Sequence, residues 1–202
     1  MKTELTKQNT LIAVAMEEEF GRELANDWRV VYTGIGKVNA LISISRALRE
    51  ERPSNIINFG TAGSSEKGLH GFHEVTSFKQ RDMDLRDLGL PLGATLHDEI
   101  GDIKLDRPGL SCGTGDSFVT STQEMNTDLY DMEAYAIAKL CMIEKINFLC
   151  FKYISDQANE TASNDWNQNL SNAGEAFRKY LESLNAVSYT HLRAHETKAN
   201  LV

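Results

Sequence analysis

One carboxylate in this sequence stands where a buried strand is expected to end. Asp156, next to Ser155, closes the apolar run from Phe148 to Ile154. In an open α/β sheet, ligands bind beyond the carboxyl ends of the strands, so an acid at such an end faces a crevice. Partial burial raises the pKa of a carboxyl group toward general-acid use, although a strand-end Asp is more often a turn or helix cap. Asp156 is therefore a candidate proton donor.

Polar groups also follow three other expected strands. They lie in the segments Ala15–Glu19, Phe59–Gly63 and Asp131–Glu133. Asp131 and Glu133 are two residues apart, so on an extended strand end their side chains point the same way. Taken alone, a run of three acids is typical of a solvated helix start, and a glycine-rich segment is typical of a tight turn.

The elements that would position these groups alternate between strands and helices. Strands are expected over 11–15, 29–32, 56–59, 129–132 and 148–154, with a small-residue loop at 60–65. Helices are expected over 17–26, from the turn 33–39 to 50, over 133–144 and over 165–184, while 74–116 reads as short strands and loops. In the second helix Leu41, Ile44, Ser45 and Leu48 are spaced to cover one face. The alternation predicts one α/β domain, a twisted mixed β-sheet flanked by helices.

Composition narrows the classes of function. The 202 residues carry a net charge of -8, which disfavours a nucleic-acid partner because phosphates require a basic face. Three cysteines form no CxxC pair, which is typical of packed, reduced thiols. The apolar stretch 11–16 is too short for a signal-peptide core or a membrane span. We expect a soluble cytoplasmic protein with a small-molecule substrate and no membrane partner.

The last fifteen residues differ from the rest of the chain. Residues 188–202 lack apolar periodicity, follow a segment that reads as a complete terminal helix, and resemble translated cloning-adaptor sequence. The catalytic domain is therefore assigned to residues 1–187, and the tail is left out of the functional argument.

Six segments, in order, resemble the motifs of the 5′-methylthioadenosine/S-adenosylhomocysteine nucleosidases, which belong to the purine nucleoside phosphorylase and nucleosidase superfamily. They are Ala15–Glu19, Thr33–Ala40, Asn58–Gly63, Gly115–Phe118, Asp131–Ala134 and Ile154–Asp156. The resemblance implies a phosphorylase/hydrolase-like fold and hydrolysis of the N-glycosidic bond of a purine nucleoside. It also implies that no cofactor is needed, and a homodimer to which the segment 81–87 contributes.

The same resemblance assigns roles to individual residues. Glu19 would position and activate the attacking water, and Asp156 would protonate the departing purine. Glu133 would accept hydrogen bonds from the ribose hydroxyls, with Met132 packing on the sugar. Phe118 would stack on the purine while the backbone of Val119 pairs with its edge. The other substrate-binding residues would be Thr61, Gly63, Asp131 and Ser155, where Thr61 replaces the family's more usual Ser and Asp131 its usual Glu.

Alternatives remain open at the level of sequence. Phosphorylases of this superfamily carry arginines near the first and third motifs, whereas here those places hold Glu17–Glu19 and Asn58–Gly60. Hydrolysis is therefore expected over phosphate-dependent phosphorolysis, and a non-catalytic nucleoside-binding protein is a further alternative. The chain is shorter than typical members between 19 and 33 and between 89 and 113, which leaves the natural nucleoside open. His70 and His73 have no carboxylate or thiolate companions, so no metal site is predicted.

Overall fold

The computed structural model describes residues 5–21, 27–66, 68–98, 100–121 and 123–199, with side chains described as far as Leu184. The helices are α1 (Glu17–Phe20), α3 (Lys37–Glu50), α4 (Ala134–Glu144) and α5 (Ala162–Ala199), with a short 3-10 helix η1 (Arg86–Leu88). The strands are β1 (Thr10–Val14), β2 (Arg29–Tyr32), β3 (Asn55–Ser64), β4 (Gly71–Gln80), β5 (Ile103–Lys104), β6 (Leu110–Thr114), β7 (Leu129–Asp131) and β8 (Asn147–Asp156).

The sheet is mixed, and part of it closes into a ring of strands that includes β3. This strand runs parallel to β1 on one side and to β8 on the other. Strand β8 is antiparallel to β4, which is parallel to β6, and β6 is parallel to β7. Strand β7 then returns to the end of β3 as an antiparallel neighbour of Gly63 and Ser64. Five strands thus form a ring, β1 and β2 extend it as a wing, and the predicted mixed sheet is confirmed.

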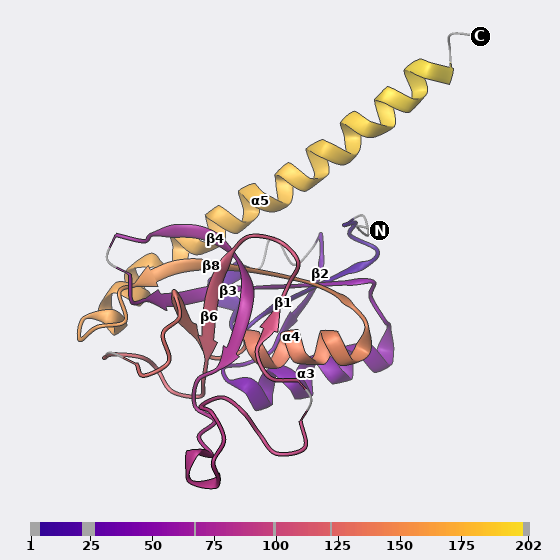
Figure 1. Ribbon diagram of the computed structural model, residues 1–202. Coiled ribbons are helices and arrows are strands. Elements are labelled where there is room, and N and C mark those ends of the chain that lie inside the picture. The colour runs from indigo at the N-terminus through magenta and orange to yellow at the C-terminus, as the bar shows by residue number, and fades with distance from the viewer. Residues whose placement is uncertain (1–4, 22–26, 67, 99, 122, 200–202) are drawn as a thin grey trace.

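Two layers of helix cover the sheet, as Figure 1 shows, with α3 and α4 together on one side and α5 on the other. The face under α3 and α4 buries aliphatic side chains, such as Leu11, Ile44 and Ile137. The face under α1 and α5 is aromatic, and the rings of Phe59 and Phe177 stack with centroids 4.1 Å apart. Because each fully buried side chain of this size contributes roughly 1.5–3 kcal/mol, these contacts hold α5 against the strands that carry the site.

Three expected boundaries were wrong. Residues 60–64, predicted as a loop, continue β3, because both neighbouring strands supply hydrogen-bond partners that outweigh the turn preference of glycine. Strand β8 likewise runs on through Asp156. Helix α5 begins at Ala162 and continues to Ala199, and in Figure 1 its C-terminal half extends away from the sheet.

Two of the expected helices also differ in detail. Helix α1 ends at Phe20, before Gly21 with its positive φ of 84°, and residues 22–26 of the expected helix lie outside the described part of the chain. In α3 the buried positions are Ala40, Ile44 and Ala47, whereas Leu41 is exposed. Among the described residues, no helix is both long and apolar enough to span a bilayer.

Candidate active site

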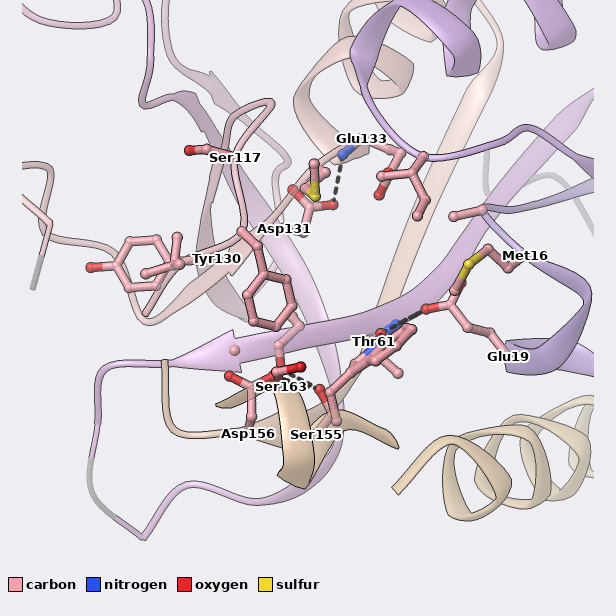
Figure 2. A pocket seen from close by; sticks show the side chains of 18 of the residues that line it. Met16, Glu19, Thr61, Ser117, Tyr130, Asp131, Glu133, Ser155, Asp156 and Ser163 are labelled. Atoms are coloured by element: carbon pink, nitrogen blue, oxygen red, sulfur yellow. Dashed lines mark hydrogen bonds between the residues drawn. The ribbon is translucent and has the colours of Figure 1, made fainter. Parts of the chain in front are cut away.

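A cavity of about 380 Å³ opens where β3, β7 and β8 end, between α1 and the start of α5. All ten residues predicted for catalysis or substrate binding line it, and Figure 2 shows several of them converging from different elements. The cavity is lined by Ala15, Met16, Glu19, Ile35, Thr61, Ala62, Gly63, Arg81, Ser117, Phe118, Val119, Tyr130, Asp131, Met132, Glu133, Ser155, Asp156, Ser163 and Trp166.

Glu19 is buried in α1 and is held through only one of its carboxylate oxygens. Its Oε1 accepts a hydrogen bond from the backbone N–H of Thr61 at 2.8 Å and another from the Thr61 hydroxyl at 2.6 Å (Figure 2). Its Oε2 is buried and has no hydrogen-bond partner among the described residues. A buried carboxylate oxygen without a partner is costly, so Oε2 is placed to accept a hydrogen bond from a bound molecule. Of the three acids in this run only Glu19 turns inward, since Glu18 is exposed and Glu17 half-buried.

Asp156 is buried at the end of β8 with hydrogen bonds to both carboxyl oxygens. The backbone N–H of Ala158 donates to Oδ1 at 2.9 Å. The Ser155 hydroxyl donates to Oδ2 at 2.8 Å, as Figure 2 shows. Burial raises the pKa of Asp156 although these two hydrogen bonds oppose the shift. The group is thus poised to carry a proton, as a general acid requires.

Gly63 makes room for that carboxyl group. A Cβ at this position would lie 2.7 Å from Asp156 Oδ1 and 3.2 Å from the Ala158 Cβ. The structure therefore explains why Gly63, paired with Asp156 across β3 and β8, carries no side chain.

Glu133 lies at the N-terminus of α4 and reaches the turn before α3. Its Oε1 accepts a hydrogen bond from the backbone N–H of Gly36 at 2.7 Å. Burial, followed by the nearby charge of Asp131, raises the pKa of Glu133 to about 8, whereas Lys152 and the Gly36 N–H oppose the shift. Gly36 adopts a φ of 95°, which L side chains rarely adopt, and this presents its N–H to the carboxylate.

Asp131 lines the cavity, but both of its carboxylate oxygens already have partners within the protein. Its Oδ1 accepts from the Thr114 hydroxyl at 2.5 Å, and its Oδ2 accepts from the N–H of Ala134 at 2.8 Å and lies 2.8 Å from Lys152 Nζ. Both side chains of this ion pair are only 1% exposed. Burial alone would raise the pKa of Asp131, but Lys152 and Thr114 lower it below its usual range. The pair places an ionised carboxylate beside Glu133.

The opposite end of the cavity is formed by the loop after β6. Phe118 lines the cavity with 48% of its side chain exposed, and Val119 is buried against Tyr130 and Ala158. Arg81, at the end of β4, holds this loop by donating to the carbonyls of Gly115 and Ser117. It also donates to the side chains of Ser117 and Gln123.

Several contributors were not predicted from the sequence. Lys152 stands inside the apolar run of β8, where a lone buried lysine signals a charged partner, and Arg81 stands in the charged stretch 81–87. Trp166 and Met16 line the cavity without belonging to any predicted chemistry. His73 Nε2 lies 2.8 Å from the carbonyl of His70, and among the described residues no group of three or more His, Cys, Asp or Glu side chains could hold a metal ion.

Comparison with known proteins identifies relatives over most of the chain. Residues 96–186 match the model of the phosphorylase superfamily. A 5′-methylthioadenosine/S-adenosylhomocysteine nucleosidase of Staphylococcus haemolyticus is 30% identical over 91% of this chain and 92% of that protein. A nucleosidase of the same name from Haemophilus influenzae is also 30% identical, over 78% of this chain and 80% of its own.

Solved structures share the fold at lower sequence identity. A mutant nucleosidase of Helicobacter pylori with 5′-methylthioadenosine in its active site has a TM-score of 0.79 at 21% identity, covering 88% of this chain and 98% of that one. A mutant futalosine hydrolase of the same bacterium has a TM-score of 0.80 at 19% identity, with the same coverage. With a relative at 30% identity over 91% of its length, the chain belongs to the family of 5′-methylthioadenosine/S-adenosylhomocysteine nucleosidases.

Proposed function

We propose that this protein hydrolyses the N-glycosidic bond of a purine nucleoside, releasing the free base and a ribose derivative. The observation that carries the proposal is the contrast between two carboxyl groups in one cavity. Glu19 offers a buried oxygen without a partner, whereas burial raises the pKa of Asp156. Pairs of acids with such different surroundings are the usual signature of base and acid in glycoside hydrolysis.

The proposed reaction uses these groups in concert. Water held by Oε2 of Glu19 attacks the anomeric carbon, and Glu19 takes its proton. Asp156 gives its proton to the leaving purine, so the bond breaks through a sugar with oxocarbenium character. Glu133 accepts hydrogen bonds from the ribose hydroxyls. Because its pKa is raised to about 8, it carries a full negative charge only above that pH, where it also stabilises the cationic sugar in the transition state. Met132 packs on the sugar, and Phe118 stacks on the purine.

The remaining predicted residues support these groups. Thr61 fixes Glu19, Ser155 donates to Asp156, and Gly63 leaves space for that carboxyl group. Asp131, whose oxygens are engaged by Lys152, Thr114 and the start of α4, acts on substrate through its negative charge beside Glu133 rather than by a direct contact.

Two arguments favour water over phosphate as the nucleophile. The four terminal N–H groups of Arg81 are engaged by Gly115, Ser117 and Gln123, and Lys152 is paired with Asp131. Of the two cations, only the Nε–H of Arg81 has no hydrogen-bond partner among the described residues, so a phosphate would lack the pair of guanidinium N–H groups that binds it in a bidentate manner, and Glu19 would repel its charge.

The substrate class follows from the walls of the cavity together with the relatives. Met16 and Ile35 contribute apolar side chains to the lining of the cavity. An apolar 5′-alkylthio group, as in 5′-methylthioadenosine or S-adenosylhomocysteine, suits such a surface better than a charged one.

The direct test is product analysis. The protein is incubated with a panel of purine nucleosides, with and without phosphate, and the sugar product is identified by mass spectrometry. We expect free base and free sugar at the same rate in both conditions. Sugar 1-phosphate as the main product, with activity only when phosphate is added, would establish phosphorolysis instead.

We further propose a homodimer. Around the mouth of the cavity, Ile35 is 46% exposed, and the outer face of α3 exposes Val38 at 64% and Ile42 at 46%. An apolar surface of this kind is typical of an interface. The segment 81–87 contributes less than expected, because Arg81 is buried and holds the loop after β6, while Asp82, although exposed, pairs with Lys37. A fully active monomer by light scattering at micromolar concentration would contradict the dimer.

A cytoplasmic location is also proposed. The three cysteines are free and buried, and burial raises the pKa of both Cys141 and Cys150 to about 12. Thiols of this kind are inert packing groups, as is usual in a reducing compartment.

A further inference from the structure

Trp166, in the second turn of α5, connects the terminal helix to the water-activating carboxylate. Its side chain lines the cavity, and its indole N–H donates a hydrogen bond to the Thr61 hydroxyl at 2.9 Å. The same hydroxyl lies 2.6 Å from Oε1 of Glu19. Three residues from α5, β3 and α1 are thus joined in one chain of hydrogen bonds.

The protons available on each group determine which group donates and which accepts in this chain of hydrogen bonds. An indole N–H can only donate, so the Thr61 oxygen must accept from Trp166. An ionised carboxylate can only accept, so the single hydroxyl proton of Thr61 must point to Glu19. Trp166 therefore orients the Thr61 hydroxyl as a donor, and hydrogen bonds in such a chain polarise one another.

As a result, the two carboxylate oxygens of Glu19 have different surroundings. Oε1 receives both the backbone N–H and the hydroxyl of Thr61, whereas Oε2 is buried and unpartnered. A carboxylate anchored at one oxygen in this way presents the other in a defined direction. That geometry is what a general base needs if its substrate is a single water molecule.

We propose that Trp166 is a positioning residue for the water-activating step, acting through the Thr61 hydroxyl to hold Glu19 with Oε2 toward the attacking water. The inference rests on the proposed function and adds to it. It also explains why the entry of α5 packs against the site: docking of this helix completes the orientation of the base. Phenylalanine at this position would fill similar space, yet it could not donate the hydrogen bond.

The experiment compares Trp166→Phe, Thr61→Val, Thr61→Ser and the double variant Trp166→Phe/Thr61→Val, with kcat and KM measured separately. We expect Trp166→Phe to lower kcat about 5- to 10-fold with little change in KM, in line with the loss of one hydrogen bond. Thr61→Val should lower kcat further, on the order of 30-fold or more, because Glu19 loses a charge-assisted bond. Thr61→Ser keeps the hydroxyl and should stay within about threefold of the wild type.

The double variant is decisive because, once Thr61 is replaced by valine, the indole N–H of Trp166 has no hydroxyl to orient. Trp166→Phe should cause no additional loss of kcat in the Thr61→Val background. Trp28→Phe is the matched control: Trp28 is the chain's other tryptophan and is buried in the aromatic core, so its replacement should leave kcat unchanged. An independent reading comes from the indole N–H resonance of Trp166 in a nitrogen–proton correlation spectrum, which should move in Thr61→Val and in Glu19→Gln.

The outcomes separate the two proposals. If the protein hydrolyses nucleosides but Trp166→Phe lowers kcat equally in both backgrounds, or not at all, the positioning role is wrong and the proposed function stands. If the wild-type protein hydrolyses no nucleoside, the proposed function fails and the positioning role fails with it.

Discussion

Replacing Glu133 with glutamine should remove the loss of folding stability that ionisation of this buried carboxyl group causes as the pH rises. Burial, together with the charge of Asp131, moves the pKa of Glu133 from an ordinary value of 4.5 to about 8. The folded protein therefore binds this proton more tightly than the unfolded chain does. The resulting stabilisation is complete below about pH 4.5 and is lost as the pH rises toward 8.

The magnitude follows from linkage. Each pH unit in this window costs about 1.4 kcal/mol of unfolding free energy. Between pH 5 and 8 the wild type should thus lose about 4 kcal/mol relative to Glu133→Gln, which has no proton to release. The loss is large compared with the roughly 5–15 kcal/mol that keeps a typical domain folded. The glutamine side-chain carbonyl can still accept the hydrogen bond from Gly36 that Glu133 accepts in the wild type.

The assay is urea unfolding at pH 5, 6, 7 and 8, at one protein concentration, with tryptophan fluorescence as the signal. The stability difference between Glu133→Gln and the wild type should grow with pH. Above pH 8, where Glu133 is ionised in the wild type, kcat/KM of the variant should be lower on the order of 100-fold because the ribose loses its ionised partner. Glu182→Gln makes the same chemical change on the exposed face of α5 and should show a constant offset. A difference for Glu133→Gln that stays constant within about 1 kcal/mol from pH 5 to 8 would refute the reasoning.

Three further predictions concern the support of the site. Lys152→Met leaves Asp131 buried without its cation and should lower the unfolding free energy by about 3–5 kcal/mol, with Asp131→Asn recovering part of the loss in the double variant, as measured by urea unfolding. Gly63→Ala places a Cβ within 2.7 Å of Asp156 Oδ1 and should lower kcat on the order of 10-fold or more, whereas Gly101→Ala, whose added Cβ meets nothing within 4 Å, should not. Removal of residues 188–202, which we propose are not part of the catalytic domain, should leave kcat/KM unchanged, since the superfamily match ends at residue 186.

The residues that the sequence singled out for the candidate site all line one cavity, whereas several predicted boundaries of the elements around them were wrong. Glu19 follows β1 and Asp156 ends β8, and both strands run parallel to β3 and so bring their ends to one edge of the sheet. Glu133 follows β7, which is antiparallel to β3, and it reaches the same cavity through the closure of the ring. Local sequence preference predicted the wrong structure where pairing between distant strands determines it. Residues 60–64 read as a turn but form strand, because β7 and β8 pair with them from both sides.

Other features depend on tertiary contacts that no local pattern encodes. The ring closure of the sheet requires β7 to meet β3, two strands separated by the whole middle of the chain. In α3, Ala40 and Ala47 flank Ile44 on the face buried toward the core, while Leu41, which is similar in size to Ile44, remains on the outside. The ion pair between Lys152 and Asp131 joins the interior of one strand to the end of another, so the local sequence around either residue does not predict its partner.

The central claim is that Glu19 and Asp156 perform different halves of one hydrolysis, and Asp156→Asn and Glu19→Gln test it most directly. Both changes are nearly isosteric, and each should lower turnover of a purine nucleoside on the order of 100-fold or more. On a nucleoside whose leaving group needs no protonation, Asp156→Asn should recover much of its rate, whereas Glu19→Gln should remain slow for lack of a base. Near-native turnover of the purine nucleoside by both folded variants would contradict the account.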